Sequence, residues 1–479
     1  WRGTAQGDGG TESGVGGVTT AQLGEIASIV RGIAFPKEDK SAEPLPGHVA
    51  CLRTTNVQRT VEWEDLWFVP EKHVKREEQI VRSGDILIST ANSYELVGKV
   101  APVTGMPHKA TLGAFISLIR PNERVDPKFL YHQLAWGKTQ SRIRETASTT
   151  TNISNVSTKK LLTLEMFTPP LDEQREIVAE LEKQFSRLDE AVANLQRVKA
   201  NLKRYKASVL KAAVEGRLVP TAAELARREG RTFETGEQLL QRILEVRRGQ
   251  WQKKTGYKEP SRPALSDQCD LPDGWAWACV EQLNPGNRPC AYGVLQPGDD
   301  LATGVPFVRV GDIDDGLVDL SELKRIHPDI ASAYPRTKLI GGEVLLTLVG
   351  AIGRTAVVPS TLAGANVARA VGVLPINESV DPHWVEMWFR NPAKIAEMTG
   401  KSHEVARKTL NLEDVRLAAV AVPPRLEQGR IVAEVDRHLS IIREVEAEVD
   451  ANLQRAQALR QVSLAKAFME KPLQNIPRK

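Results

Sequence analysis

The chain has 479 residues, of which 64 are basic and 60 acidic, so its formal net charge is only +4. This length is too great for one ordinary hydrophobic core, and the near-balance of charge excludes a polycation, so any nucleic-acid surface is local. No apolar run reaches the length of a membrane span and the N-terminus lacks the pattern of a signal peptide, so we expect a cytoplasmic protein.

Metal and disulfide chemistry find no support in the sequence. The eight histidines show no HExxH or HxxxH spacing, and the cysteines show no CxxC spacing: Cys51, Cys269, Cys279 and Cys290. We therefore predict neither a disulfide framework nor a metal site, and we interpret the cysteines as small buried hydrophobic residues.

The first elements in chain order are a tail and a mixed domain. Residues 1–18 are predicted to be a flexible tail, because the first 17 contain seven glycines and no core. Residues 19–168 combine short β-like runs, such as DILIST and AFISLI, with one helical stretch, DPKFLYHQLAW, in which Pro127 suits the first helical turn. This texture predicts a mixed α/β globular domain.

A long helix and a helical linker follow. From 171 to 215 an apolar residue recurs every seven positions, which predicts a coiled-coil helix within residues 169–219. The predicted stripe consists of Leu181, Leu188, Leu195, Leu202 and Val209, with Ala191, Val198, Tyr205 and Ala212 between them. In the linker, residues 220–270, Thr221 and Glu224 form a capping box, Gly230 ends the helix, and a second helix runs over 238–248. Its arginines indicate a solvated face or, less simply, a contact with phosphates or an acidic partner.

The rest of the chain repeats the beginning. PPLDEQREIVAEL (169–181) returns as PPRLEQGRIVAEV (423–435), and VDPKFLYHQL (125–134) returns as VDPHWVEMWF (380–389). We therefore predict a second mixed domain over 271–422, a second long helix over 423–472 and a tail over 473–479. The second apolar stripe is predicted to contain Ile431, Val435, Leu439, Ile442, Val445, Val449, Leu453 and Leu459.

Pairing of the two long helices decides the architecture. A single striped helix cannot bury its stripe alone, and antiparallel packing lets the second helix return toward the first domain, which parallel packing makes awkward. We predict a pseudo-two-fold arrangement, which suits half-sites along duplex DNA as in dimeric DNA-binding proteins.

Polar loops of both globular domains are the candidate DNA-binding residues. Short hydroxyl and amide side chains with scattered cations suit contacts to base edges and phosphates, although most polar loops are simply solvated. In the first domain the candidates are Arg53, Thr54, Thr55, Asn56, Gln58, Arg59, Ser89, Asn92, Ser93, Tyr94, Lys99, Thr150, Thr151 and Asn152. In the second domain they are Arg309, Asp312, Arg354, Arg369, Lys401, Ser402, His403, Arg407 and Lys408.

Catalytic motifs were not found. TPPL (168–171) and VPPR (422–425) lack the first residue and the aromatic of an adenine methyltransferase motif, and GKT (137–139) lacks the glycine of a Walker A loop because position 132 is histidine. Asp312, Asp314 and Asp315 lack the ligand ladder of a calcium loop. A methyltransferase or nuclease acting alone is therefore disfavoured.

Two divergent globular domains, each followed by a PPxxEQxxIVAE helix, resemble the specificity (S) subunit of type I restriction-modification enzymes. The linker TAAELARREGRTFETGEQLLQRILEVRRGQWQKK (221–254) followed by LPDGWAWACVEQL (271–283) is also similar to one branch of that family. The resemblance covers nearly the whole chain, from about Thr19 to Pro472. It implies an α+β fold with two mixed α/β target recognition domains joined by two long antiparallel coiled-coil helices.

The resemblance further implies a non-catalytic subunit that recognises a bipartite, asymmetric DNA site. Two modification subunits would supply S-adenosylmethionine and two restriction subunits ATP and Mg, with no cofactor bound by this chain. The candidate docking edge comprises Glu173, Gln174, Ile177, Val178, Glu427, Gln428, Ile431 and Val432, although the isoleucines suit the start of the coiled coil equally well. A specificity protein of a related defence system and a coiled-coil scaffold without sequence preference remain alternatives.

Overall fold

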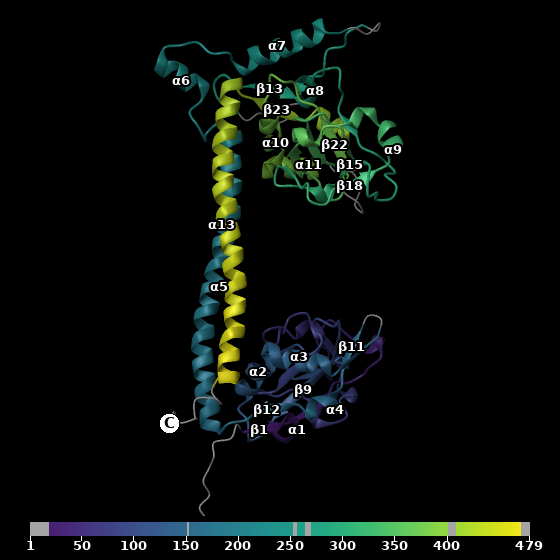
Figure 1. Cartoon of the computed structure of the whole chain (residues 1–479), viewed down its shortest axis with the longest axis vertical. Helices are drawn as coiled ribbons and strands as arrows, with labels where there is room; N and C mark the ends of the chain where they lie inside the picture. Colours follow the sequence, from purple (N-terminus) through teal and green to yellow (C-terminus); the bar gives the residue numbers. More distant parts are fainter. Residues whose placement is uncertain (1–18, 151–152, 252–255, 264–269, 401–408, 471–479) are drawn as a thin grey trace, which may run out of the picture. The chain divides into compact units, whose positions relative to one another are not determined.

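The structure is a computed structural model that describes residues 19–150, 153–251, 256–263, 270–400 and 409–470 (Figure 1). The chain divides into two compact units: Trp1–Gln196 with Asp450–Lys479, and Arg197–Val449. We call them the first and the second unit. Within the described ranges, every helix is too short or too polar to cross a lipid bilayer.

The first unit contains the first globular domain and one end of each long helix. Its strands are β1 (Thr20–Gln22), β2 (Ala27–Arg31), β3 (His48–Leu52), β4 (Trp67–Pro70), β5 (Ile86–Ser89), β6 (Ala91–Asn92), β7 (Val100–Pro102), β8 (Ala110–Leu112), β9 (Ile116–Pro121), β10 (Ala147–Thr149), β11 (Ser154–Val156) and β12 (Glu165–Phe167). Its α-helices are α1 (Leu23–Ile26), α2 (Pro127–Ala135), α3 (Gly137–Glu145), α4 (Thr158–Leu162) and the start of α5 (Leu171–Val214). Its short 3-10 turns are η1 (Lys37–Asp39), η2 (Thr54–Asn56), η3 (Glu71–His73) and η4 (Glu77–Gln79).

The second unit contains the linker, the second globular domain and the other end of each long helix. Its strands are β13 (Ala276–Cys279), β14 (Ala291–Tyr292), β15 (Val305–Val308), β16 (Ile313–Asp314), β17 (Leu317–Val318), β18 (Lys324–Ile326), β19 (Val344–Thr347), β20 (Thr355–Val357), β21 (Asn366–Val367), β22 (Val371–Leu374) and β23 (Ala419–Val422). Its helices are α6 (Ala222–Glu229), α7 (Gly236–Gly249), α8 (Val280–Leu283), α9 (Pro328–Ser332), α10 (Pro382–Arg390), α11 (Pro392–Gly400), α12 (Leu412–Arg416) and the start of α13 (Arg425–Ala465). Its 3-10 turns are η5 (Val310–Asp312), η6 (Pro335–Thr337) and η7 (Ser360–Leu362), and α13 continues into the π-helical turn η8 (Lys466–Glu470) of the first unit.

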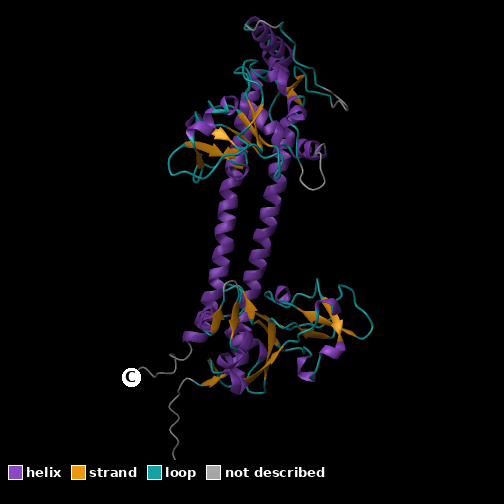
Figure 2. Cartoon of the chain, turned by 90° about the vertical axis from the view of Figure 1, so that its right-hand side faces the viewer, coloured by secondary structure: helices purple, strands orange, loops and turns teal. Residues whose placement is uncertain are grey.

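The two globular domains have the same topology. The antiparallel order β2-β9-β5-β7 of the first domain corresponds to β14-β22-β19-β20 of the second, and β4-β3-β8 corresponds to β18-β15-β21. In both three-stranded sheets the second pairing, β3 with β8 or β15 with β21, is parallel. Figure 2 shows these strands flanked by helices, so the predicted α+β class and internal repeat are confirmed.

Local sequence explains the paired helices α2 and α10. Asp126 caps α2 by accepting bonds from the backbone N–H groups of Lys128 and Phe129, and Asp381 caps α10 through the N–H of His383. A proline occupies the first helical turn in both copies, where its missing N–H costs nothing. The predicted helix after VDP is confirmed in both domains.

A buried glutamine joins each globular domain to its long helix. Gln174 on α5 is fully buried; its Oε1 accepts from the backbone N of Asp126 at 2.8 Å and its Nε2 donates to the carbonyl of Pro169 at 2.7 Å. Gln428 on α13 makes the same pair of bonds with Asp381 and Pro423, both at 2.8 Å. The repeated PPxxEQ motif therefore fixes the angle at which each domain meets its helix.

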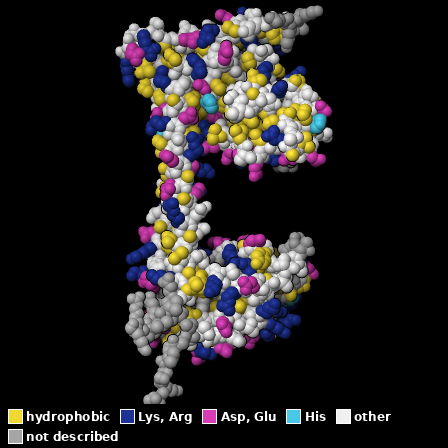
Figure 3. All heavy atoms as spheres, viewed as in Figure 1, with side chains coloured by type: hydrophobic (Ala, Val, Ile, Leu, Met, Phe, Trp, Pro, Cys, Tyr) yellow, Lys and Arg dark blue, Asp and Glu magenta, His cyan; other side chains and the backbone are white. Residues whose placement is uncertain are grey.

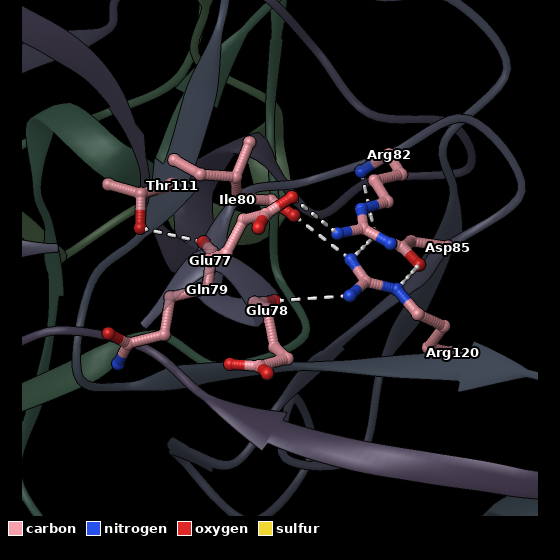
Figure 4. Close-up of polar contacts among 8 residues, drawn as sticks. All are labelled: Glu77, Glu78, Gln79, Ile80, Arg82, Asp85, Thr111 and Arg120. Atoms are coloured by element: carbon pink, nitrogen blue, oxygen red, sulfur yellow. Dashed lines mark hydrogen bonds and ion pairs between the residues drawn. The ribbon is translucent and has the colours of Figure 1, made fainter. Parts of the chain in front are cut away.

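A buried carboxylate stabilises the turn before β5 in the first domain. Asp85, 2% exposed, accepts from Nε and Nη2 of Arg120 at 2.8 and 2.7 Å and from the backbone N of Arg82 at 2.7 Å (Figure 4). Arg120 also donates to the carbonyls of Glu78 and Ile80. These bonds satisfy the charges that burial would otherwise leave uncompensated, and the bond to Asp85 raises the pKa of Arg120.

The second domain meets the same need with a different arginine. Glu343 stands where Asp85 stands in the first copy, and its carboxylate accepts from the backbone N–H groups of Ile340 and Gly341 at 2.8 Å. Its ion-pair partner is Arg288 at 2.8 Å, which precedes β14, whereas Arg120 lies on β9. Both copies therefore have an acidic residue at this position. Its arginine partner lies on β9 in the first domain and in the segment before β14 in the second.

The two long helices are paired antiparallel, as predicted. In the first unit the start of α5 meets the end of α13: Asp189 bonds Arg460 at 2.8 Å, and Leu181 and Phe185 share a core with Leu464. In the second unit the end of α5 meets the start of α13: the hydroxyl of Tyr205 lies 2.9 Å from Nδ1 of His438, and Val209 shares a core with Ile431. Both views draw α5 and α13 side by side (Figures 1 and 2).

The detailed stripe prediction was partly wrong. Ala191, Val198 and Tyr205 are exposed, as are Val445 and Leu459 on the second helix. At the two ends of α5 the buried residue instead lies four positions after the stripe residue: Phe185 follows Leu181 and Ala213 follows Val209, whereas Lys199 in the middle of the helix is exposed. On α13 the buried positions include Ala456 and Leu464 in place of Leu459. Core residues of a coiled coil follow one another at alternating spacings of three and four. The prediction placed the intermediate core residues three positions after each stripe residue, which is the wrong spacing at the ends of α5.

The linker packs against the start of α13. The predicted capping box forms, because Thr221 accepts from the N–H of Glu224 and Glu224 accepts from the N–H of Thr221, and Gly230 ends α6 in the left-handed conformation, φ 61°. Glu427 of α13 is fully buried and accepts from the N–H of Ala222 at 2.7 Å and from Nε1 of Trp275 at 2.9 Å. Burial raises the pKa of Glu427.

Replacing the joint glutamine should destabilise the unit that contains it. We expect Gln174→Ala to lower the free energy of unfolding of the first unit by about 1–3 kcal/mol, because the buried Pro169 carbonyl and the Asp126 N–H lose their partner. Gln428→Ala should act equally on the second unit. Urea denaturation with hydrogen exchange measures both, and exposed Glu176→Ala is the matched control. If Gln174→Ala and Glu176→Ala have the same free energy of unfolding, Gln174 does not stabilise the joint between the domain and its helix.

A buried histidine should make the first unit sensitive to acid. Burial lowers the pKa of His132, which packs on Phe185, from 6.5 to about 4. The neutral ring is favoured in the folded state, so this contribution is present above pH 6.5 and is lost as pH falls toward 4, by up to about 3 kcal/mol. In stability measurements from pH 7 to 4, His132→Phe should flatten the profile relative to wild type. Exposed His108→Gln should not; equal slopes would contradict the assignment.

Candidate nucleic-acid interface

The same tight corner occurs at the end of β3 and of β15. In the first corner, residues 53–57, Arg53 precedes η2 and its backbone N donates to Oδ1 of Asn56 at 2.8 Å. In the second corner, residues 309–313, Arg309 precedes η5 and its backbone N donates to Oδ2 of Asp312 at 2.7 Å. One side chain, three positions after the arginine, therefore closes each corner.

Asn56 and Asp312 are bonded within the corners. Asn56 is 2% exposed and also donates to the carbonyls of Glu62 and Glu64 at 3.0 Å. Asp312 is 9% exposed and accepts from the guanidinium of Arg309 at 2.9 Å, which raises the pKa of Arg309. Both residues were predicted to contact DNA, but their polar atoms are already occupied within the domain.

Hydrogen bonds connect the first corner to the loop after β5. Lys99 donates to Oε1 of Gln58, whose Nε2 donates to the carbonyl of Thr55 at 2.9 Å. Ser89 is buried, and its hydroxyl accepts from Nδ2 of Asn92 at 3.3 Å, which shapes the loop. Among these predicted residues Ser89 is therefore unavailable to a ligand.

The hairpin β10–β11 extends the same surface. β11 pairs with β6, placing Ser154 opposite Asn92. Ser93 donates its backbone N–H to Oδ1 of Asn92, while Tyr94 is 52% exposed. Thr150 is exposed and bonds to Ile153 across the hairpin end. The predicted contacts Thr151 and Asn152 lie outside the described residues.

One exposed aromatic on this surface was missed. Phe115 is 61% exposed, and its carbonyl accepts from the N–H groups of Thr90 and Ala91 at 2.9 and 3.1 Å. In the sequence Phe115 belongs to the apolar run AFISLI, which predicts a buried strand. In the structure β9 begins at Ile116, so Ala114 and Phe115 lie in the turn before the strand.

Two further arginines lie near the second corner. Arg369 is exposed and follows β21, whose Val367 pairs with Val308 immediately before Arg309. Arg354 is exposed and its Nη1 donates to the carbonyl of Ile313 at 3.3 Å. The predicted basic loop with Lys401, Ser402, His403, Arg407 and Lys408 lies outside the described residues.

Charged contacts connect these loops to the long helices. In the first unit Arg59 donates to Oδ2 of Asp189, and the bond to Arg59 lowers the pKa of Asp189. In the second unit Lys206 pairs with Asp315, which also accepts from Arg390. In the first unit the loop supplies the cation, Arg59, and α5 the anion; in the second unit the loop supplies the anion, Asp315, and α5 the cation. An ion pair therefore joins the loop after each corner to α5.

On the face shown in Figure 3, basic and acidic side chains are interspersed over both units. The linker arginines follow this pattern: Arg227 pairs with Asp273 at 2.7 Å and Arg242 with Glu234 at 2.8 Å, while Arg247 donates to the carbonyl of Glu281. These contacts favour the solvated interpretation of the linker arginines over a phosphate-binding one.

The predicted docking edge is mostly interior. Gln174, Ile177, Val178, Glu427, Gln428 and Ile431 are buried, whereas Glu173 and Val432 are half-buried. The buried side chains are engaged in joining domain to helix, so they cannot present a free edge. Exposed neighbours remain, among them Glu176 on α5 and Leu426 on α13, which is 74% exposed.

The cysteines and possible metal ligands are scattered through the described part of the chain. No group of three or more His, Cys, Asp or Glu side chains there is arranged to hold a metal ion. Cys51 and Cys279 are buried free thiols and Cys290 is half-buried; Cys269 lies outside the described residues. Burial raises the pKa of Cys51 and of Cys290 to about 12, so neither supplies a thiolate near neutral pH.

Comparisons with known proteins agree with this architecture. A family model described as the type I restriction modification DNA specificity domain matches residues 16–203. The type I restriction enzyme EcoBI specificity subunit of Escherichia coli is 33% identical over 347 residues, covering 72% of this chain and 66% of that subunit. The EcoKI specificity subunit of Escherichia coli strain K12 is 24% identical over 468 residues, covering 94% of this chain and 88% of that subunit.

A solved structure concerned with complex assembly and conformational transition of the type I R-M system has the same fold. One of its chains matches 94% of this chain with a TM-score of 0.61 at 16% identity, and 97% of that chain is covered. Together with the family model and the two specificity subunits, the duplicated domains and antiparallel helices lead to one conclusion: this chain belongs to the family of type I restriction-modification specificity subunits.

Proposed function

We propose that the chain is the DNA-recognition subunit of a type I restriction-modification complex and reads a bipartite, asymmetric site. The observation that carries the proposal is the pair of corners: one backbone design, closed by Asn56 in one domain and Asp312 in the other. Loops of unlike sequence surround the two corners, so each domain presents different donors and acceptors to base edges. Two unlike half-sites separated by unread base pairs follow.

The chain recognises DNA and leaves the chemistry to its partners. Two modification subunits would bring S-adenosylmethionine, and two restriction subunits would bring ATP and Mg. The complex would act in the cytoplasm, where its DNA substrate is found. Docking would use exposed side chains beside the buried joint motif, such as Glu176 and Leu426, because the joint itself is occupied within each unit.

The two docking edges are chemically unequal. On α13 Glu427 is covered by Ala222 of the linker and by Trp275 of the second domain. On α5 the corresponding Glu173 is half-buried, and position 172 is an exposed aspartate where α13 has the exposed Leu426. A partner that binds both edges therefore meets an acidic surface on one and an apolar surface on the other.

Site selection tests the proposed function directly. The chain, assembled with its modification subunit, should select from random duplexes a single motif made of two short specified parts around an unspecified gap. Methylome sequencing of the source cells should return the same motif with methyladenine on both strands. Salt-sensitive binding without any sequence preference would instead identify a scaffold.

Removing an exposed arginine near the second corner should weaken DNA binding. We expect Arg369→Ala to lower affinity by roughly tenfold and, if the contact is to a phosphate, to reduce the salt slope by about one. Mutating base pairs of the second half-site should reveal a base contact, because the variant then loses discrimination at one position. Titration by fluorescence anisotropy measures both. Arg227→Ala, an exposed linker arginine paired with Asp273, is the control; equal affinities would exclude Arg369.

A further inference from the structure

The first domain contains a cavity beside the first corner. Its volume is about 560 Å³, within the range of small-ligand sites. It lies between the first corner and the turn before β9, and its walls include Phe35, Cys51, Trp67 and Phe115. Thr54 and Thr55, two predicted DNA contacts, line the same cavity.

Comparison of the two domains explains why the cavity is open here. Strand register places Cys51 of β3 beside Trp67 of β4, and Phe307 of β15 beside Lys324 of β18, so Phe307 is the counterpart of Cys51. Phe307 is 1% exposed and fills its position. The first domain has a thiol where the second has a phenyl ring, so this part of its wall is smaller.

A second pair of counterparts points the same way. Ile33 forms a parallel bridge with Gly113, and its counterpart Val294 forms one with Ala368. Gly113 lines the cavity and has no side chain, whereas Ala368 packs against the core around Phe307. Two independent reductions in side-chain volume therefore meet at one place in the first domain.

The chemistry of the walls favours a flat, anionic ligand. Lys37, Lys40 and Arg53 line the cavity and no carboxylate is among the lining residues, although Arg53 is paired with Asp65 at 2.6 Å. Nζ of Lys40 and Cζ of Arg53 each lie 4.4 Å from the centre of the Trp67 ring. Aromatic and guanidinium planes stack on unpaired bases, and the lysines suit a phosphate.

The position of Phe115 supplies a means of filling the cavity from duplex DNA. Phe115 is 61% exposed at the mouth, next to Thr90 and Ala91, which donate to its carbonyl. Exposed apolar side chains on DNA-binding surfaces act as wedges that separate stacked bases. A wedge beside a basic, aromatic-lined cavity is the arrangement that an unstacked nucleotide needs.

We propose that the cavity between the first corner and Phe115 holds one unstacked nucleotide of the first half-site, with its base beside Phe35 and Phe115 and its phosphate near Lys37. This inference rests on the proposed function, because it assumes that the first domain reads DNA. The second domain, filled by Phe307, reads its half-site without such a nucleotide.

Scanning a fluorescent base through the target tests the proposal. The assembled complex is titrated with duplexes carrying the selected site, in which 2-aminopurine replaces each base of both half-sites in turn. Apart from the adenine that the modification subunits methylate in each half-site, we expect a several-fold rise in fluorescence at one position of the first half-site and at none of the second. Sequence-specific binding without any such rise overturns the inference but leaves the proposed function intact; loss of sequence preference itself refutes the proposed function.

Variants assign the rise to the cavity. Cys51→Phe, which copies the second domain, should abolish the rise and weaken binding on the order of tenfold. Because this change could also disturb folding, the exposed pair Lys37→Ala/Lys40→Ala is measured beside it and should weaken binding to the same duplex while leaving the unfolding curve unchanged. Lys109→Ala, paired with Glu71 in the same domain, is the matched control. A persistent rise and unchanged affinity in both variants would exclude the cavity.

Discussion

An apolar stripe on a 44-residue helix is the constraint from which the architecture follows. A helix of this length that leaves one stripe exposed is not stable in water, and among the described residues the one other helix of comparable length is its own repeat, α13. Pairing within one chain requires the second helix to run back along the first. The core contacts of both units satisfy this condition, with the start of one helix always beside the end of the other.

The joint between each long helix and its globular domain fixes the orientation of that domain on the helix. Gln174 and Gln428 each bind a backbone carbonyl at the helix start and the N-cap aspartate of the neighbouring helix, α2 or α10. Ion pairs at Asp189 and Asp315 add a second attachment between a recognition loop and a long helix. Each globular domain is therefore attached to its long helix at two points.

Sequence alone predicted what depends on local pattern. The duplicated domains, the two long helices, the helix that begins at Pro127 and the Thr221 capping box are all consequences of short-range periodicity or fixed spacing. The exact seam of the coiled coil was missed, because positions three and four residues after each leucine were both partly apolar. The roles of Asn56 and Gln174 were also missed. A polar side chain has the same sequence signature whether it binds backbone, solvent or DNA, and only the fold decides which.

The structure separates what the repeat must keep from what it can change. Asn56 and Asp312 differ in charge but close the same corner through the same backbone N–H, so the corner does not dictate what surrounds it. Likewise Cys51 and Phe307 occupy one place in the sheet, yet only the smaller residue lines a cavity. Because the frame is held by the joints and the paired helices, such exchanges alter the surface without altering the positions of the strands. A duplicated frame of this kind can therefore present two unlike surfaces, which is what an asymmetric DNA site demands.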